Sequence, residues 1–180
     1  MQRFRVLHES EIECRVKQVA ERGAVILLYK TARTDMDLLD ETVGAENWQC
    51  DYKEIKGNLY CGIGVRTGED KPYVWKWDCG IESREDEDGN QKKGEASDSF
   101  KRAGFKWGIG RELYTAPFIW IPADKLHLEK RERQGKVKWF TRDTFCVEKI
   151  AYDDTRRMTG LALRNEKTHK RVFVWERGQA

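Results

Sequence analysis

The chain has 180 residues, of which 36% are charged and 39% hydrophobic, and its formal net charge is +3. This length suits one domain with a small addition, and it allows a stable core without disulfides. The first ten residues hold no apolar run, and the longest run, residues 24–29, is far too short to cross a bilayer. We therefore expect a cytoplasmic protein that has no membrane partner.

The cysteines argue against a metal or disulfide framework. Their number is odd, and no two of them have the spacing of a zinc-binding or redox pair. We interpret them as small buried hydrophobes in a reducing compartment. The five are Cys14, Cys50, Cys61, Cys79 and Cys146.

The N-terminal quarter predicts two strands and a helix. Residues 12–19 alternate between apolar and polar, which fits a strand better than a helix, and residues 24–29 form an apolar run typical of a buried strand. Residues 31–43 have apolar side chains at helical spacing, and Gly44 follows as a C-terminal cap.

Three further strands are predicted over residues 47–55, 59–66 and 73–81. Gly57-Asn58 between the first two is a hairpin signal, so the three should form an antiparallel meander. The third strand alternates with aromatic residues, and this pattern leads us to expect that at least one of Trp75 and Trp77 packs in the core. Base stacking on either indole is the alternative.

An acidic stretch follows at residues 82–91. It has five acids, one arginine and no apolar residue, which predicts a surface loop that contributes little to folding. Clustered carboxylates can hold a hard cation, but the spacing of a calcium loop is missing. We therefore expect no metal and no cofactor.

Residues 92–114 predict a second helix with two apolar faces. One stripe, formed by Ala96, Phe100, Ala103, Trp107 and Tyr114, should pack on the sheet. A second stripe lies roughly opposite, and an exposed apolar stripe implies a covering partner. We predict that it forms a homo-oligomer interface, made by Phe105, Ile109 and Leu113.

Basic residues of this helix lie between the two stripes. Lys101, Arg102 and Lys106 form a ridge that could contact phosphates, although a solvated helix face explains the same pattern. Gly104 and Gly108 leave a notch where another backbone could approach closely.

From residue 125 the chain becomes strongly basic. Residues 125–177 contain fifteen Lys and Arg against eight Asp and Glu, with apolar residues in short alternating patches. We predict an α+β chain with a core domain over residues 1–123 and a small basic β-rich segment over 124–180.

Catalytic motifs are not found. There is no phosphate-cradling loop and no nucleophile elbow, and the three histidines are scattered. We expect a protein that is not an enzyme. Two alternatives stay open: a metal-dependent nuclease built from Asp51, Asp78 and Asp98, and a module that binds duplex nucleic acid.

The stretch KGEASDSFKRAGFKWGIGRELY, residues 93–114, resembles the signature helix of the Rad-fifty-two-like single-strand annealing superfamily. That superfamily includes phage Sak-like and bacterial DdrA-like recombination proteins. The matching positions run from Ala96 through Ser97-Asp98 and Lys101-Arg102-Ala103 to Trp107-Gly108. Residues 38–44 and Trp48 are similar to the family's first helix and the start of its hairpin.

The resemblance implies a curved antiparallel sheet packed against helices, in subunits that assemble as a ring or filament. It further implies ATP-independent binding and annealing of single-stranded DNA in recombination and repair, in a phage- or prophage-encoded protein of a bacterial cytoplasm. The partners it implies are single-stranded DNA and further copies of the chain. A host single-strand-binding protein and a phage exonuclease are additional candidates.

The family's basic pair matches Lys101 and Arg102, and Arg33 approximately matches another groove position. Where some relatives carry a third basic residue, this chain has Phe105, with Lys106 beside it. The candidate DNA-binding residues are therefore Arg33, Lys92, Lys93, Lys101, Arg102, Lys106 and Arg111.

Overall fold

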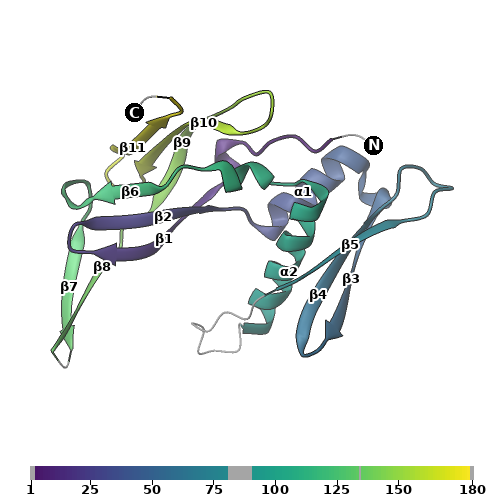
Figure 1. Cartoon of the computed structure of the whole chain (residues 1–180), viewed down its shortest axis with the longest axis horizontal. Helices are drawn as coiled ribbons and strands as arrows, with labels where there is room; N and C mark the ends of the chain where they lie inside the picture. The colour runs from purple at the N-terminus through teal and green to yellow at the C-terminus, as the bar shows by residue number, and fades with distance from the viewer. Residues whose placement is uncertain (1–2, 81–90, 134, 179–180) are drawn as a thin grey trace. The chain divides into compact units, whose positions relative to one another are not determined.

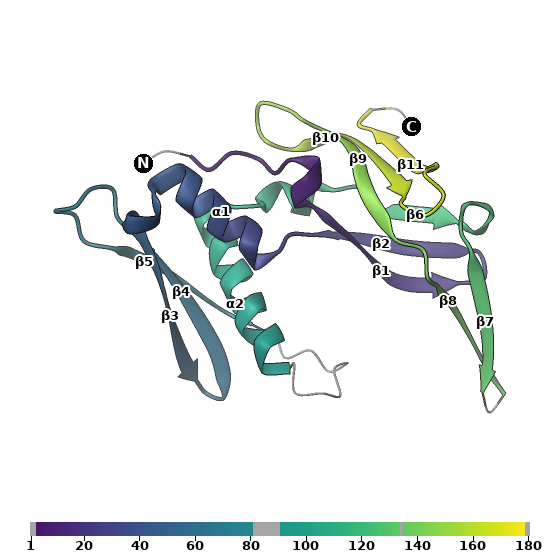
Figure 2. The ribbon, with the colours of Figure 1, turned by 180° about the vertical axis from the view of Figure 1, so that it is seen from behind.

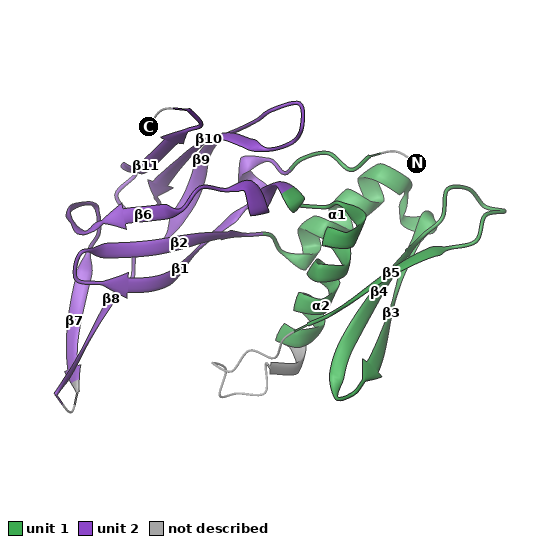
Figure 3. Cartoon of the chain, viewed as in Figure 1, with its two compact units in different colours: residues 1–6, 30–111 green, residues 7–29, 112–180 purple. Residues whose placement is uncertain are grey.

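The structure, a computed structural model, describes residues 3–80, 91–133 and 135–178 and has an α+β fold (Figure 1). The chain folds into two compact units, shown in Figure 3. Unit 1 comprises residues 1–6 and 30–111, and unit 2 comprises residues 7–29 and 112–180. The predicted acidic loop, apart from its last residue, lies outside the described residues.

Unit 1 contains both α-helices and a three-stranded sheet. Its elements are α1 (Ala32–Val43), β3 (Trp48–Ile55), β4 (Asn58–Val65), β5 (Val74–Cys79) and α2 (Gln91–Trp107). The sheet has the order β3-β4-β5 with antiparallel neighbours, which confirms the predicted meander. Figures 1 and 2 show both helices on the same side of this sheet.

Helix α1 forms where the sequence predicts it. The Thr31 side chain caps the first turn by accepting a hydrogen bond from the backbone N of Thr34 at 3.1 Å. Gly44 ends the helix at φ 86°, a conformation that favours glycine. The helix buries Leu38 and Leu39 completely.

The core of unit 1 lies between α2 and the sheet. Because strand residues alternate between faces, Cys61, Ile63 and Val65 of β4 point together toward α2, and all three are buried. Helix α2 supplies Phe100, Ala103 and Trp107 to the same core, and the Trp107 indole donates to the backbone O of Ile63 at 2.9 Å.

Helix α2 ends at Trp107, seven residues before the predicted end at Tyr114. Gly108 and Gly110 have φ values of 99° and 73°, which break the helix, and a 3-10 helix follows over Arg111–Thr115. The predicted second stripe is therefore wrong as a helix face, because Phe105, Ile109 and Leu113 do not continue along one helix. Ile109 is completely buried in its own chain, so it is not part of an exposed interface.

Unit 2 is built on a six-stranded antiparallel sheet of the order β11-β10-β9-β1-β2-β6. Strand β1 joins β9 through the pair Glu13 and Cys146, so strands from both ends of the chain share one sheet. The chain after residue 124 is therefore part of a larger unit and not a separate appendage. The bounds are β1 (Glu13–Ala20), β2 (Gly23–Tyr29), β6 (Ile119–Pro122), β9 (Phe145–Tyr152), β10 (Met158–Asn165) and β11 (Arg171–Glu176).

A separate two-stranded ribbon completes unit 2. Strands β7 (Leu128–Arg133) and β8 (Lys136–Thr141) pair with each other in an antiparallel ladder. The ribbon extends from the end of the six-stranded sheet in both views (Figures 1 and 2). Across both units, neither described helix has the length and apolar composition needed to cross a bilayer.

Candidate nucleic-acid interface

Strand β5 carries two different surfaces on its two sides. It is an edge strand, paired only with β4 in the described sheet. Lys76 and Asp78 are paired with Ile63 and Cys61 of β4, and therefore point toward α2. Trp75 and Trp77 point to the opposite face of the sheet.

The surface toward α2 has an acidic centre with cations around it. The carboxylate of Asp78 lies 3.6 Å from the Arg102 guanidinium and 3.7 Å from the Lys106 ammonium. The Lys106 ammonium also donates to the backbone O of Trp77. One carboxylate thus holds two helical cations against the strand, and it neutralises only one of their two charges.

Two further cations gather at the C-terminal end of α2. The Lys76 ammonium donates to the backbone O of Lys106 at 2.9 Å, and Arg111 donates to the carbonyls of Phe105 and Lys106 at 2.5 and 2.8 Å. Cations at this end of a helix are favoured by its dipole. Lys76 also lies 4.3 Å from the centre of the Trp107 ring, and burial, followed by the charge of Arg111, lowers its pKa.

These residues form what we call the basic cluster, which consists of Lys76, Arg102, Lys106 and Arg111 around Asp78. It has four cations and one acid, so it keeps an excess of three positive charges on one surface of unit 1. Arg102, Lys106 and Arg111 were candidates from the sequence, and the structure brings them together. Lys76 and Asp78 complete the set.

The remaining sequence candidates are not part of this cluster. Lys101 lies 3.8 Å from Asp98 on its own helix, and only 18% of its side chain is exposed. Arg33 is exposed on the first turn of α1, and no ion pair or hydrogen bond in the described residues joins its side chain to the cluster. The side chains of Lys92 and Lys93 lie outside what the structure describes.

The opposite face of the sheet carries two indoles that lie flat on β4. A Cβ atom on Gly62 would stand 2.5–2.6 Å from three ring atoms of Trp77, and one on Gly64 would stand 2.8–3.0 Å from the same atoms of Trp75. Near-equal distances to three adjacent ring atoms place each glycine under the middle of the six-membered ring. Each indole therefore has one face on a glycine and the other face directed away from the sheet.

We call these two rings the indole platform. Their centroids are 5.6 Å apart and their planes are inclined by 24°, so the two rings are nearly parallel neighbours. The Lys53 ammonium lies 4.3 Å from the Trp77 ring, and the Arg66 guanidinium lies 5.4 Å from the neighbouring Tyr73 ring. Neither Trp75 nor Trp77 is in the buried core, so the expectation that one of them packs there is wrong.

A buried ion pair lies between the two helices. Both side chains are almost fully buried, and the Lys30 ammonium is 2.6 and 2.5 Å from the two carboxylate oxygens of Asp35. The same ammonium donates to the backbone O of Lys101 at 3.2 Å and lies 4.2 Å from the centre of the Phe105 ring. Burial raises the pKa of Asp35 to about 6, although Lys30 acts in the opposite direction.

Gly104 makes room for this pair. A Cβ at that position would lie 2.4 Å from a carboxylate oxygen of Asp35. The notch expected at Gly104 therefore exists, but a side chain of the same unit fills it. Gly108 has no such neighbour, and it serves the end of the helix instead.

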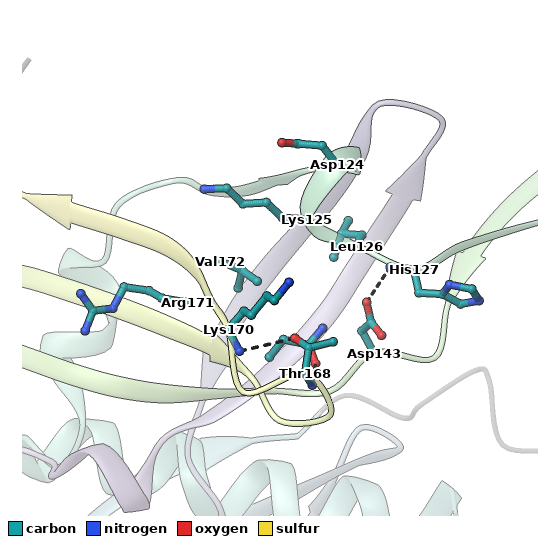
Figure 4. Close-up of a pocket in the computed structure, with 10 residues that line it drawn as sticks. Asp124, Lys125, Leu126, His127, Asp143, Thr168, Lys170, Arg171 and Val172 are labelled. Carbon is teal, nitrogen blue, oxygen red and sulfur yellow. Dashed lines mark hydrogen bonds between the residues drawn. The ribbon is translucent and has the colours of Figure 1, made fainter.

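Unit 2 contains a pocket of about 440 Å³, shown in Figure 4. Lys125, Lys170 and Arg171 contribute positive charge, and Asp124 and Asp143 contribute negative charge. The guanidinium of Arg171 is already paired with Glu148 at 2.5 Å, and Asp143 accepts the backbone N–H of His127 at 2.8 Å. Charges of both signs line the pocket in similar number, so it lacks the positive excess of the basic cluster.

The described residues contain no group of three or more His, Cys, Asp or Glu side chains arranged to hold a metal ion. Comparison with known proteins gives no relative: no family model, no curated protein and no solved structure matches the chain.

Proposed function

We propose that the chain binds single-stranded DNA without sequence preference and helps complementary strands to anneal. The observation that supports this most is the two-sided character of β5. One edge strand presents the basic cluster on one side and the indole platform on the other. A single strand has the two matching features, a charged backbone and bases that are free to stack.

The basic cluster suits a phosphate backbone. Its three excess positive charges lie on the surface, with the side chains of Arg102 and Lys106 39% and 48% exposed. Neutralising phosphates releases condensed counterions, which makes binding favourable at low salt and weaker as salt rises. Contacts to the phosphate backbone carry no sequence information, which suits binding that does not depend on sequence.

The indole platform suits unpaired bases. Every base has a π-face, and stacking on an aromatic ring contributes about 1–3 kcal/mol per base with little sequence preference. In a duplex each base is already stacked between neighbours, so a flat aromatic surface favours the single strand. Lys53, over the Trp77 ring, can move aside and still remain near the strand's phosphates.

Annealing follows from these two interactions. Complementary strands pair spontaneously, and repulsion between their phosphates slows their approach. A protein that neutralises one backbone and holds the bases extended lowers that barrier without nucleotide hydrolysis. The resemblance of residues 93–114 to strand-annealing proteins is in agreement with this chemistry.

The test is a binding titration with labelled oligo-deoxythymidine at several salt concentrations, followed by a fluorescence annealing assay without nucleotide. We expect Trp75→Ala to weaken binding by about 5-fold or more. The pair Arg102→Gln and Lys106→Gln should reduce the slope of log K against log salt by about 0.7 for each phosphate that is no longer neutralised. Annealing rates should fall in both variants, and they should fall further in the variant that loses more affinity.

Lys71→Gln is a matched control, because Lys71 is an exposed lysine of unit 1 outside the basic cluster. It should change the affinity by less than about 2-fold. Thermal melts establish that each variant is folded. Unchanged affinity and annealing in folded Trp75→Ala and in the folded double variant would contradict the proposal.

A further inference from the structure

The β7–β8 ribbon of unit 2 has a distribution of charge that its own fold does not explain. Residues 128–141 contain five Lys or Arg residues and two Glu residues. In the described part of the chain, β7 and β8 pair only with each other and belong to no larger sheet. We call this element the basic arm, and Figures 1 and 2 show it extending from unit 2.

The register of the basic arm places like charges directly opposite each other. Arg131 is paired with Lys138, and Arg133 is paired with Lys136. Residues that face each other in an antiparallel ladder have side chains on the same side, and like charges in that position are destabilising. A repulsive pair, Arg131 with Lys138, thus lies toward the outer end of the arm.

The acids of the arm do not relieve this repulsion. Glu129 lies nearer the base of the arm and is paired with Arg142 at 3.3 Å. Glu132 is opposite Val137, which places it on the other face of the ribbon. Among the residues that the structure describes, no carboxylate lies within ion-pair distance of Arg131, Lys136 or Lys138.

The face of the arm that carries Arg131, Lys136 and Lys138 can bind a ligand through charge, and it has no free aromatic ring. Its ring, Phe140, is covered by the Arg131 guanidinium, which lies 4.4 Å from the ring centre. This face therefore has a single ring under a cation, whereas the indole platform of unit 1 has two adjacent rings. The ligand that this face fits is a polyanion with regularly spaced charges.

The geometry of the arm favours a duplex over a single strand. Six residues in each strand give a ribbon about 20 Å long. The major groove of B-form DNA, about 12 Å wide, admits a two-stranded ribbon, and the phosphate rows on its walls have fixed spacing. A row of cations along the ribbon can meet phosphates whose spacing is already fixed, without the loss of entropy that ordering a flexible single strand requires.

We propose that the basic arm binds the phosphate backbone of duplex DNA through Arg131, Lys136 and Lys138. This goes beyond the single-strand binding proposed for unit 1, and it stands without that proposal because it depends on different residues. A protein with both surfaces holds an unpaired strand at one unit and a duplex, such as the annealed product, at the other.

The test compares a triple variant, Arg131→Gln, Lys136→Gln and Lys138→Gln, with the wild-type chain. Binding is measured by fluorescence anisotropy with a duplex of about 30 base pairs and with oligo-deoxythymidine, between about 50 and 200 mM salt. We expect the triple variant to lose about 10-fold or more in duplex affinity, with a salt slope smaller by about two to three. Its affinity for oligo-deoxythymidine should change by less than about 2-fold.

The matched control is the triple variant Lys149→Gln, Arg157→Gln and Lys170→Gln. It removes the same number of exposed positive charges from unit 2, away from the arm. Equal losses of duplex affinity in the two triple variants would overturn the proposal in favour of a general effect of net charge. A wild-type chain that does not bind duplex would overturn it directly.

Two more outcomes decide the identity of the ligand and the integrity of the fold. A loss confined to oligo-deoxythymidine would overturn the duplex assignment and make the arm part of a single-strand site. The melting temperature of the arm variant should change little, because the removal of repulsion offsets the loss of the contact between Arg131 and Phe140. If the triple variant does not fold, Lys138→Gln alone is measured, with an expected loss of about 2- to 3-fold in duplex affinity and none for the single strand.

Discussion

The basic cluster of unit 1 and the basic arm of unit 2 each carry an excess of three positive charges, but they hold them differently. In the cluster, Lys76 and Arg111 donate to the carbonyls at the end of α2, and Asp78 pairs with Arg102 and Lys106. In the arm, cations face each other across a ladder. The two surfaces have the same excess of positive charge, and they differ in the groups that each cation contacts.

This difference has a consequence for mutation. Cations that also satisfy backbone carbonyls stabilise the fold, so replacing them lowers stability together with any binding. Cations that repel each other lower the stability of the free chain, so replacing Lys136 or Lys138 should lower binding without lowering stability.

The largest effect is expected at the buried pair of Lys30 and Asp35. Lys30→Met leaves the carboxylate of Asp35 without its counter-ion in a site where it is fully buried. Removal of one partner of a buried pair costs about 3–5 kcal/mol, which should appear as a large fall in the urea midpoint. Lys30→Met with Asp35→Leu should recover most of the loss, because no charge is then buried. A mild effect of Lys30→Met alone would mean that water reaches Asp35.

Asp35 should also make stability depend on pH. Its pKa in the folded chain is about 6, against 3.8 for the free side chain, and burial is the main cause. Between these values the folded state binds more protons than the unfolded state, so this contribution to stability is largest below about pH 4 and is lost as pH rises through about 6. A tenfold change in an ionisation constant corresponds to about 1.4 kcal/mol, so the change is a few kcal/mol at most.

Urea midpoints of wild type and Asp35→Asn, measured from about pH 4 to 7, check this contribution. The amide does not titrate, so the difference between the two curves should change over this window and be flat above it. Parallel curves at every pH would show that Asp35 has the same pKa in the folded and unfolded chains.

Much of unit 1 could be predicted from the sequence because its signals are local. The alternation of residues 59–66, the Gly57-Asn58 hairpin signal and the Thr31 and Gly44 caps all depend on neighbours a few residues apart. The structure has β4 and α1 there, and it turns the hairpin one residue earlier, at Lys56-Gly57. Lys76 was missed although strand alternation places it on the α2 face. The same alternation places Trp75 and Trp77 on the other face, but it does not say which face the helix covers.

The errors come from tertiary interactions. Gly108 looked like a notch within a long helix, yet its positive φ ends α2 and removes the predicted interface stripe. The basic C-terminal segment looked like an appendage because nothing local shows that Cys146 on β9 pairs with Glu13 on β1. A pair separated by more than a hundred residues leaves no periodic pattern in either segment.

A moderate effect is expected when a side chain is added under the indole platform. In Gly62→Ala the new Cβ would lie about 2.5 Å from the Trp77 ring, so the indole must lift from the strand. Crowding of this kind costs about 1–3 kcal/mol, and it should weaken single-strand binding while leaving duplex binding by the arm unchanged. Circular dichroism melts and oligo-deoxythymidine titrations measure the two effects.

Gly68→Ala is the matched control for this substitution. Its nearest neighbour to an added Cβ is the Lys71 side chain at 3.7 Å, an ordinary van der Waals distance. It should leave both measurements within about 0.5 kcal/mol of wild type. If Gly62→Ala behaves like Gly68→Ala, the indoles do not rest on the strand as the platform requires.

The smallest expected effect is a change in stability, and its sign distinguishes the basic arm from the basic cluster. Lys138→Glu places a carboxylate opposite Arg131, so a repulsive pair becomes an attractive one, and stability should rise by about 0.2–1 kcal/mol while duplex affinity falls. At the cluster the same change should act in the opposite direction: Lys106→Glu puts a second carboxylate beside Asp78, so stability should fall. Both differences should shrink near 1 M salt, where the screening length is about 3 Å. Urea midpoints at low and high salt measure them, and a loss of stability in Lys138→Glu would mean that Lys138 has a structural role in the arm.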